Sequence, residues 1–271
     1  MYNPAMRCSP RVVAAAFASM VAATLVSTSE ASAAAPWIYR GLTLPSHDVA
    51  LDFGLGYGHA YALPDDIDGW GLNLELRAGI THTFELGFRI GFRLDDGGRA
   101  TQADYFGRPF ETETYGTLFD STSNPELKFR WSVARSYAAE LGLELRAYLP
   151  IEAGSRFGFM FGLPIALRAG IVRLDTGLFV PVIFYPQTLT VVSIPLHIWI
   201  QAAHNVWVGP LLGLQVISQN GSRTAYPLGF GLGLQAARNV DLRTWFLFRD
   251  MNQDRAARYW GAGVGLEVRF E

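Results

Sequence analysis

Residues 84–94 read FELGFRIGFRL, with an apolar side chain at every second position and a polar residue or glycine between them. A second stretch, LGLELRAYL at residues 141–149, has the same period. Successive side chains of a β-strand point to opposite faces. Each stretch is therefore predicted to be a long strand with one apolar face.

The same period-two pattern predicts twelve strands after residue 47. Connections after the even-numbered strands are tight, whereas those after the odd-numbered strands are generally longer, the longest being residues 95–124. One end of the structure should therefore carry short turns and the other end loops, which is typical of a transmembrane β-barrel. The predicted strands lie near residues 48–58, 70–80, 83–94, 125–134, 138–149, 157–169, 173–185, 190–201, 206–216, 226–236, 240–249 and 258–270.

Strand length separates the barrel from its two alternatives. Strands of a soluble β-sandwich usually have ~5 or 6 residues, whereas a membrane-spanning strand needs ~9 to 11. Residues 189–217 contain no Asp, Glu, Lys or Arg, but Pro195, Pro210 and a polar turn at His204 argue against a membrane helix there. The predicted fold is all-β: a closed antiparallel transmembrane β-barrel with short periplasmic turns and longer extracellular loops.

The first 33 residues have the features of a cleaved export signal. Arg7 and Arg11 precede an apolar stretch at residues 12–26, and a small-residue cleavage site follows before Ala34. The expected organisation is a signal peptide at 1–33, an N-terminal segment at 34–47, and a barrel at 48–271 that includes the long loop 95–124. The single cysteine, Cys8, lies in the signal, which excludes a disulfide, a zinc–thiolate site and a cysteine nucleophile in the exported chain.

With this signal and strand rhythm, the chain resembles bacterial outer-membrane β-barrel proteins. Its last strand, WGAGVGLEVRF at residues 260–270, has the alternation and near-terminal aromatic residue that this class commonly presents to its assembly machinery. Phe270 is followed by Glu271, so the aromatic residue is penultimate rather than final. The resemblance implies location in the outer membrane, with lipid and the barrel-assembly machinery as partners.

Composition agrees with an ordered protein that does not bind nucleic acid. Half of the residues are hydrophobic and 17% are charged, which excludes disorder and a coiled coil. The formal net charge of −2 gives no basic footprint for a nucleic acid.

If the apolar side chains face lipid, the alternate positions face the lumen. On the second to seventh strands those positions carry five acidic and seven basic residues. They are expected either to pair across strands and fill the barrel, or to line a polar path with a mild preference for anions. The residues are Glu75, Arg77, Glu85, Arg89, Arg93, Lys128, Arg130, Glu140, Glu144, Arg146, Arg168 and Asp175.

The opposite wall is predicted to be a smooth strip of glycine. Because glycine weakens a strand unless something approaches its backbone closely, we expect a segment or ligand to pack there. The candidates are the N-terminal segment, through Trp37 and Tyr39, and the 95–124 loop. The strip consists of Gly54, Gly56, Gly58, Gly229, Gly231, Gly233, Gly261, Gly263 and Gly265.

Catalytic and metal motifs are weak. His197 and Ser193 share a face but lie about 13 Å apart along one strand, at ~3.3 Å per residue, too far for a nucleophile and its base. The acidic run that begins at Asp250 lacks the Gly and Glu of a calcium loop. We therefore expect no enzyme activity, no cofactor and no metal.

The sequence favours a narrow pore or transporter for small polar or anionic solutes, working by diffusion through the charged lumen. One alternative is a closed barrel with a structural or surface-interaction role, in which the lumen charges only hold the fold. An outer-membrane hydrolase is the third hypothesis.

Overall fold

The computed structural model describes residues 36–62, 65–93, 125–150, 157–184, 188–218, 221–248, 250–252 and 259–271. The signal peptide expected at 1–33 and the loop expected at 95–124 lie outside these residues.

The described residues form thirteen β-strands and a single 3-10 turn, η1 (Trp37–Tyr39). Helix η1 is too short to cross a membrane, and the described residues contain no other helix. The strands are β1 (Val49–Ala62), β2 (Asp65–Gly79), β3 (Phe84–Arg93), β4 (Glu126–Arg135), β5 (Ala139–Tyr148), β6 (Gly158–Ala169), β7 (Val172–Ile183), β8 (Leu189–Ala203), β9 (Val206–Ser218), β10 (Ser222–Ala225), β11 (Leu228–Ala237), β12 (Val240–Phe248) and β13 (Tyr259–Phe270).

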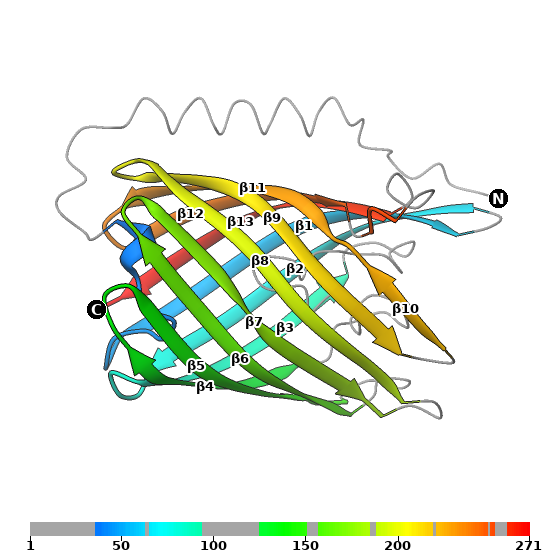
Figure 1. Cartoon of the computed structure of the whole chain (residues 1–271), viewed down its shortest axis with the longest axis horizontal. Helices are drawn as coiled ribbons and strands as arrows, with labels where there is room; N and C mark the ends of the chain where they lie inside the picture. Colours follow the sequence, from blue (N-terminus) through cyan, green and yellow to red (C-terminus); the bar gives the residue numbers. More distant parts are fainter. Residues whose placement is uncertain are drawn as a thin grey trace, which may run out of the picture.

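These strands close into one antiparallel ring (Figure 1). β10 and β11 both pair with β9 and follow one another along it, so they are two parts of one barrel strand. The interruption falls at Tyr226 and Pro227, where proline has no amide hydrogen to donate to the ladder. β13 pairs with β1 over the whole seam, from Val49 opposite Phe270 to Ala60 opposite Tyr259. The described residues therefore confirm the predicted closed barrel of twelve antiparallel strands.

Burial in this barrel is the reverse of that in a soluble protein. On β5 the carboxylate residue Glu144 has no exposed surface, whereas the adjacent Leu145 is 46% exposed. On β4, Lys128 is buried and Phe129 is 43% exposed. Soluble proteins bury leucine and phenylalanine and expose their charged residues. An apolar outer surface around a polar interior is the pattern of a barrel that stands in lipid.

The first hairpin is longer than the sequence predicts. The alternating pattern ends near residue 58 and resumes near residue 70, but β1 and β2 remain paired as far as Ala62 opposite Asp65. The expected loop at 59–69 is therefore wrong. Main-chain pairing does not require alternating hydrophobicity, so a hairpin can continue past the point where its side chains stop alternating.

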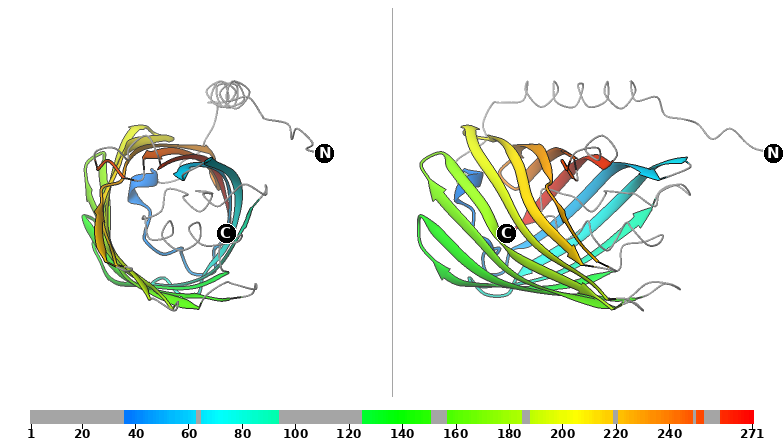
Figure 2. Two further views of the ribbon diagram at one scale, coloured as in Figure 1. Left: turned by 90° about the vertical axis from the view of Figure 1, so that its right-hand side faces the viewer. Right: turned by 45° about the vertical axis from the view of Figure 1, so that its right-hand side comes forward.

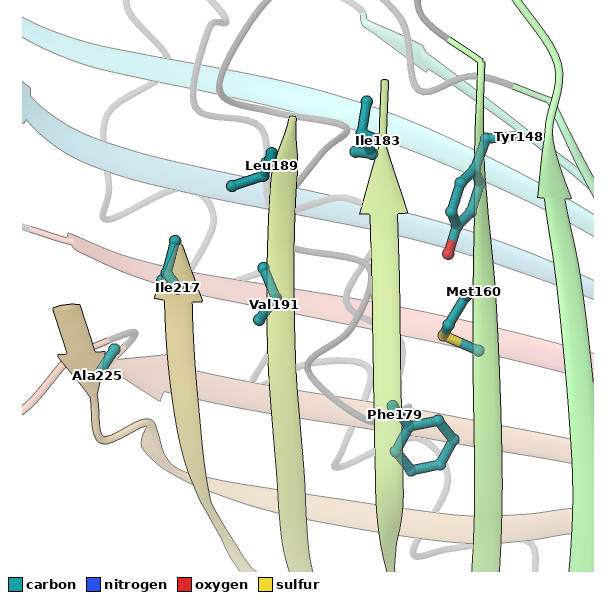
Figure 3. Close-up of a cluster of buried hydrophobic side chains, with 8 residues drawn as sticks. All are labelled: Tyr148, Met160, Phe179, Ile183, Leu189, Val191, Ile217 and Ala225. Atoms are coloured by element: carbon teal, nitrogen blue, oxygen red, sulfur yellow. The ribbon is translucent and has the colours of Figure 1, made fainter. Parts of the chain in front are cut away.

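An apolar cluster occupies part of the barrel's inner wall near the end with the longer connections. Its residues come from β5 to β10, and Figure 3 shows how they lie on neighbouring strands. On β5, Tyr148 has the same parity as the buried Arg146 and Glu144, so the cluster and the charges share the inner face. The cluster comprises Tyr148, Met160, Phe179, Ile183, Leu189, Val191, Ile217 and Ala225.

Candidate functional site

Eleven of the twelve residues predicted to line the lumen lie on the inner face of the barrel. Eight of the twelve are at most 7% exposed, and Arg77, Arg130 and Asp175 are partly exposed on the same face. Arg93 ends β3, and its side chain lies outside the described part of the chain. The eight are Glu75, Glu85, Arg89, Lys128, Glu140, Glu144, Arg146 and Arg168.

One network of charges joins β3, β4 and β5. The Glu144 carboxylate forms ion pairs with both Arg130 and Arg146. Arg146 Nη1 also lies 3.3 Å from Glu126 Oε2, and Arg89 Nη1 lies 3.5 Å from Glu126 Oε1. Each buried carboxylate in this network thus forms ion pairs with two cations. Buried groups stay charged only when such partners compensate for the loss of water.

A second network runs across the seam between β13 and β1. Lys128 Nζ lies 2.6 Å from Glu75 Oε1 and 3.3 Å from Glu85 Oε1. Arg77 approaches Glu85 as well, and its Nη2 donates to Asp52 at 2.8 Å and to Glu267 at 2.6 Å. Arg77 therefore links the charged wall to the strands that carry the glycine strip.

Several inward charges are absent from the sequence prediction. Asp52 stands two residues before Gly54 and Glu267 two residues after Gly265, so the same period-two rule places both on the inner face. Arg173 stands two residues before the predicted lumen residue Asp175, so the same rule places it on the inner face as well. The signal was present, but the prediction treated the first and last strands as purely glycine-lined. The further inward charges are Asp52, Glu126, Arg173, Asp241, Arg243, Glu267 and Arg269.

The glycines on β1 and β13 meet directly at the seam. Gly54 faces Gly265, Gly56 faces Gly263 and Gly58 faces Gly261. The three on β11 are separated from this seam by β12.

The glycine strip is not smooth, because indole rings lie over it. A Cβ on Gly263 would come within 2.7 Å of the Trp245 ring, and one on Gly231 within 2.5 Å of the Trp199 ring. Trp207 fills the space beside Gly233 in the same way. Trp207 is 1% exposed, so its ring lies inside the barrel rather than on the outer surface. Three of the nine glycines, Gly231, Gly233 and Gly263, thus make room for tryptophan rings of β8, β9 and β12.

Residues 36–48, which we call the N-terminal segment, lie inside the barrel at the end with the short turns (Figure 2). The Trp37 ring stacks on Trp207 with centroids 5.0 Å apart and meets Trp199 edge-on at 5.4 Å. Trp207 covers Gly233 of the glycine strip. The N-terminal segment, one of the two segments expected to pack on this strip, therefore contacts the tryptophan that covers it.

The charged wall holds this segment mainly through its main chain. Arg168 Nε donates to the Ile38 carbonyl at 3.0 Å. The Arg40 carbonyl accepts from Arg168 Nη2 at 2.7 Å and from Arg173 Nη1 at 2.8 Å. Further along, the Leu42 carbonyl accepts from Arg130. Guanidinium groups of β4, β6 and β7 thus bind every second carbonyl of the segment, at positions 38, 40 and 42.

Two charged contacts secure the segment elsewhere. Arg40 forms an ion pair with Asp241, which is 1% exposed and stands on β12. The Leu44 amide donates to Glu85 Oε2 at 3.0 Å. Because β12 lies across the lumen from the arginines of β6 and β7, the segment spans the lumen as well as lining it.

A cavity of about 560 Å³ adjoins the segment. Its lining contains nine arginine or lysine side chains and four carboxylate side chains. Trp37, Phe179 and His197 add aromatic surface. Each of the nine cationic side chains also forms an ion pair with a carboxylate, and some of these carboxylates, such as Asp241 and Glu144, lie outside the lining.

The described residues contain little that suggests catalysis. In register, His197 stands between Asp175 of β7 and Leu211 of β9, so neither cross-strand neighbour is a serine, threonine or cysteine that His197 could activate. No group of three His, Cys, Asp or Glu residues suited to a metal occurs among the residues with described positions.

The closed ring, the apolar exterior and the charged interior define a transmembrane β-barrel, the fold of bacterial outer-membrane proteins. No protein-family model and no curated protein matches the sequence. The fold is similar to an outer membrane channel from Pseudomonas putida F1, with a TM-score of 0.58, 10% identity, and coverage of 87% of this chain and 99% of that one. It is also similar to the NanC porin, with a TM-score of 0.56, 8% identity, and coverage of 80% and 98%.

Proposed function

We propose that this protein is a narrow pore for small anionic solutes. The observation that carries the proposal is the cavity beside the N-terminal segment, where nine cationic side chains face four carboxylates. Charges that line a confined aqueous path set its ion preference. The similarity to channel-type barrels supports a pore without identifying its solute.

The pore is expected to be narrow for two reasons. A barrel of eight strands is filled by its own side chains, and one of 16 to 18 leaves an aqueous channel, so twelve strands lie between these cases. The N-terminal segment then occupies part of the lumen at the end with the short turns. Diffusion through the space that remains selects by size as well as by charge.

A second candidate is a closed barrel with a structural role. It is favoured by the many ion pairs among the inward charges, since paired charges stabilise a fold without conducting anything. The two candidates differ in one measurable property, which is conductance.

The first test is single-channel conductance of residues 34–271, refolded and placed in a planar bilayer, with the reversal potential measured in a salt gradient. We expect steady conductance with anions more permeant than cations. Arg243→Gln removes a cation from the cavity lining without touching the N-terminal segment, and it should lower the anion-to-cation permeability ratio. Arg223→Gln makes the same charge change at the opposite end of the barrel and should lower the ratio less. Folded protein that never conducts would support the closed barrel instead.

A further inference from the structure

Two arginines of neighbouring strands converge on one neutral oxygen. Arg168 of β6 and Arg173 of β7 are direct cross-strand partners. Arg168 Nη2 and Arg173 Nη1 both donate to the carbonyl oxygen of Arg40, at 2.7 and 2.8 Å. Two adjacent guanidinium groups form a strong site for an oxyanion, but here they hold a main-chain carbonyl that has no formal charge.

The carboxylates near these arginines do not balance them. Glu140 forms ion pairs with Arg168 at 2.9 Å and with Arg135 at 2.6 Å, so one carboxylate serves two cations. Asp175 accepts from Arg173 Nε at 2.7 Å. Three guanidinium groups therefore share two carboxylates, which leaves an excess of one positive charge in the cluster that includes the two donors to the Arg40 carbonyl.

The surroundings suit a solute that carries a carboxylate on a small organic body. Arg173 and Asp175 both line the cavity, so one of the two guanidinium groups borders open space, whereas Arg168 is buried beside it. The guanidinium carbon of Arg173 also lies 4.8 Å from the centre of the Trp37 ring. An anion bound here would have a flat aromatic surface beside it.

We propose that Arg168 and Arg173 form a carboxylate-binding site for the solute, and that the Arg40 carbonyl occupies this site when no solute is bound. A carboxylate adds the attraction between opposite charges, and can accept from a guanidinium group through both of its oxygens, neither of which a neutral carbonyl offers. Its binding displaces the Arg40 carbonyl and loosens the N-terminal segment from the wall. The site rests on the proposed function, because it assigns the solute class and the first binding position of that pore.

The test uses a cysteine reporter in the segment. The only natural cysteine is Cys8, so residues 34–271 with Ile38→Cys carry one thiol. Ile38 is 1% exposed, and its carbonyl is a ligand of Arg168. The measurement is the rate at which a maleimide modifies this thiol in the refolded protein, with succinate as the probe and uncharged succinamide as the matched control. We expect succinate to raise the rate several-fold and succinamide to leave it unchanged.

Variants of the wall give a second readout. Arg173→Gln removes one of the donors that hold the Arg40 carbonyl, so the rate without succinate should rise about tenfold, the effect of losing one hydrogen bond to a charged group. The response to succinate should then be lost. Arg223→Gln, at the other end of the barrel, should keep both the low starting rate and the succinate response.

The outcomes separate this site from the pore. An unchanged modification rate with succinate overturns the site, even if the protein conducts anions. A rate that rises with succinate in a protein that does not conduct supports the site and contradicts the pore. An equal rise with succinamide also overturns the site, because the response then does not depend on the carboxylate.

Discussion

At position 144 a carboxylate with no exposed surface serves two guanidinium groups, those of Arg130 and Arg146. Glu144→Gln keeps the size of the side chain and removes its charge. We expect the free energy of unfolding to fall by about 3–5 kcal/mol, because two buried cations lose their shared counter-charge. Denaturant unfolding of the barrel in lipid vesicles measures this change.

The matched control is Glu271→Gln. Glu271 Oε2 lies 2.8 Å from Arg238 Nη2, but both side chains are more than half exposed. An exposed pair contributes about 0–1 kcal/mol, so this variant should unfold almost as the parent does. If both variants lowered the free energy of unfolding equally, burial would not determine how much these charges contribute to stability.

Period two predicts which face each side chain occupies, but not which partner it finds. Lys128 stands in register with Gly87 on one side and with Arg146 on the other, but its Nζ lies 2.6 Å from Oε1 of Glu75, which stands two strands away. Partner choice depends on the register between strands, which the pattern within a single strand does not contain. The lumen face was therefore predictable from sequence, and the ion-pair network was not.

The N-terminal segment is the element whose removal should change function most and the fold least. Every strand of the ring pairs with its neighbours without help from this segment. A chain that begins at Pro45 lacks Trp37, the Arg40 contacts and the carbonyls bound to the wall. We expect it to fold and to conduct more than residues 34–271, because the part of the segment that spans the lumen is gone.

Single-channel conductance of the two chains, each shown to be folded by its resistance to denaturation in an unheated gel, makes this comparison. Equal conductance would mean that the segment does not narrow the path. Loss of folding in the shorter chain would assign the segment a structural role instead.

The position of this segment could be predicted only in part. Its two aromatic residues made it one of two candidates for the inner wall, and Trp37 does pack there. Its attachment to Arg168, Arg173 and Arg130 runs through main-chain carbonyls, which every residue type carries. No side-chain pattern records such contacts. The length of the hairpin of β1 and β2 was underestimated for the same reason, because its outer part depends on main-chain pairing.

For the molecule as a whole, the order of the ring followed from two features of the sequence. Alternation over ten or more residues set the strands, and alternating short and long connections set their up-and-down order. Closure was predicted because an open edge in lipid leaves main-chain groups unpaired. The division of the interior was not predicted: the N-terminal segment and the cavity beside it lie near the short turns, and an apolar cluster lies near the longer connections.

This placement of charge leads to a prediction about ionic strength. The cationic excess lies around one cavity, so it acts on permeant ions through the solution inside the pore. Salt screens such a field, with a Debye length of about 10 Å at 0.1 M and about 3 Å at 1 M. The anion-to-cation permeability ratio should therefore fall toward the bulk mobility ratio as potassium chloride rises over this range. Reversal potentials at a fixed concentration ratio and increasing absolute concentration measure it. A ratio that stays constant would mean that ions are selected by direct contact at a dehydrated constriction, since screening does not reach charges from which water is excluded.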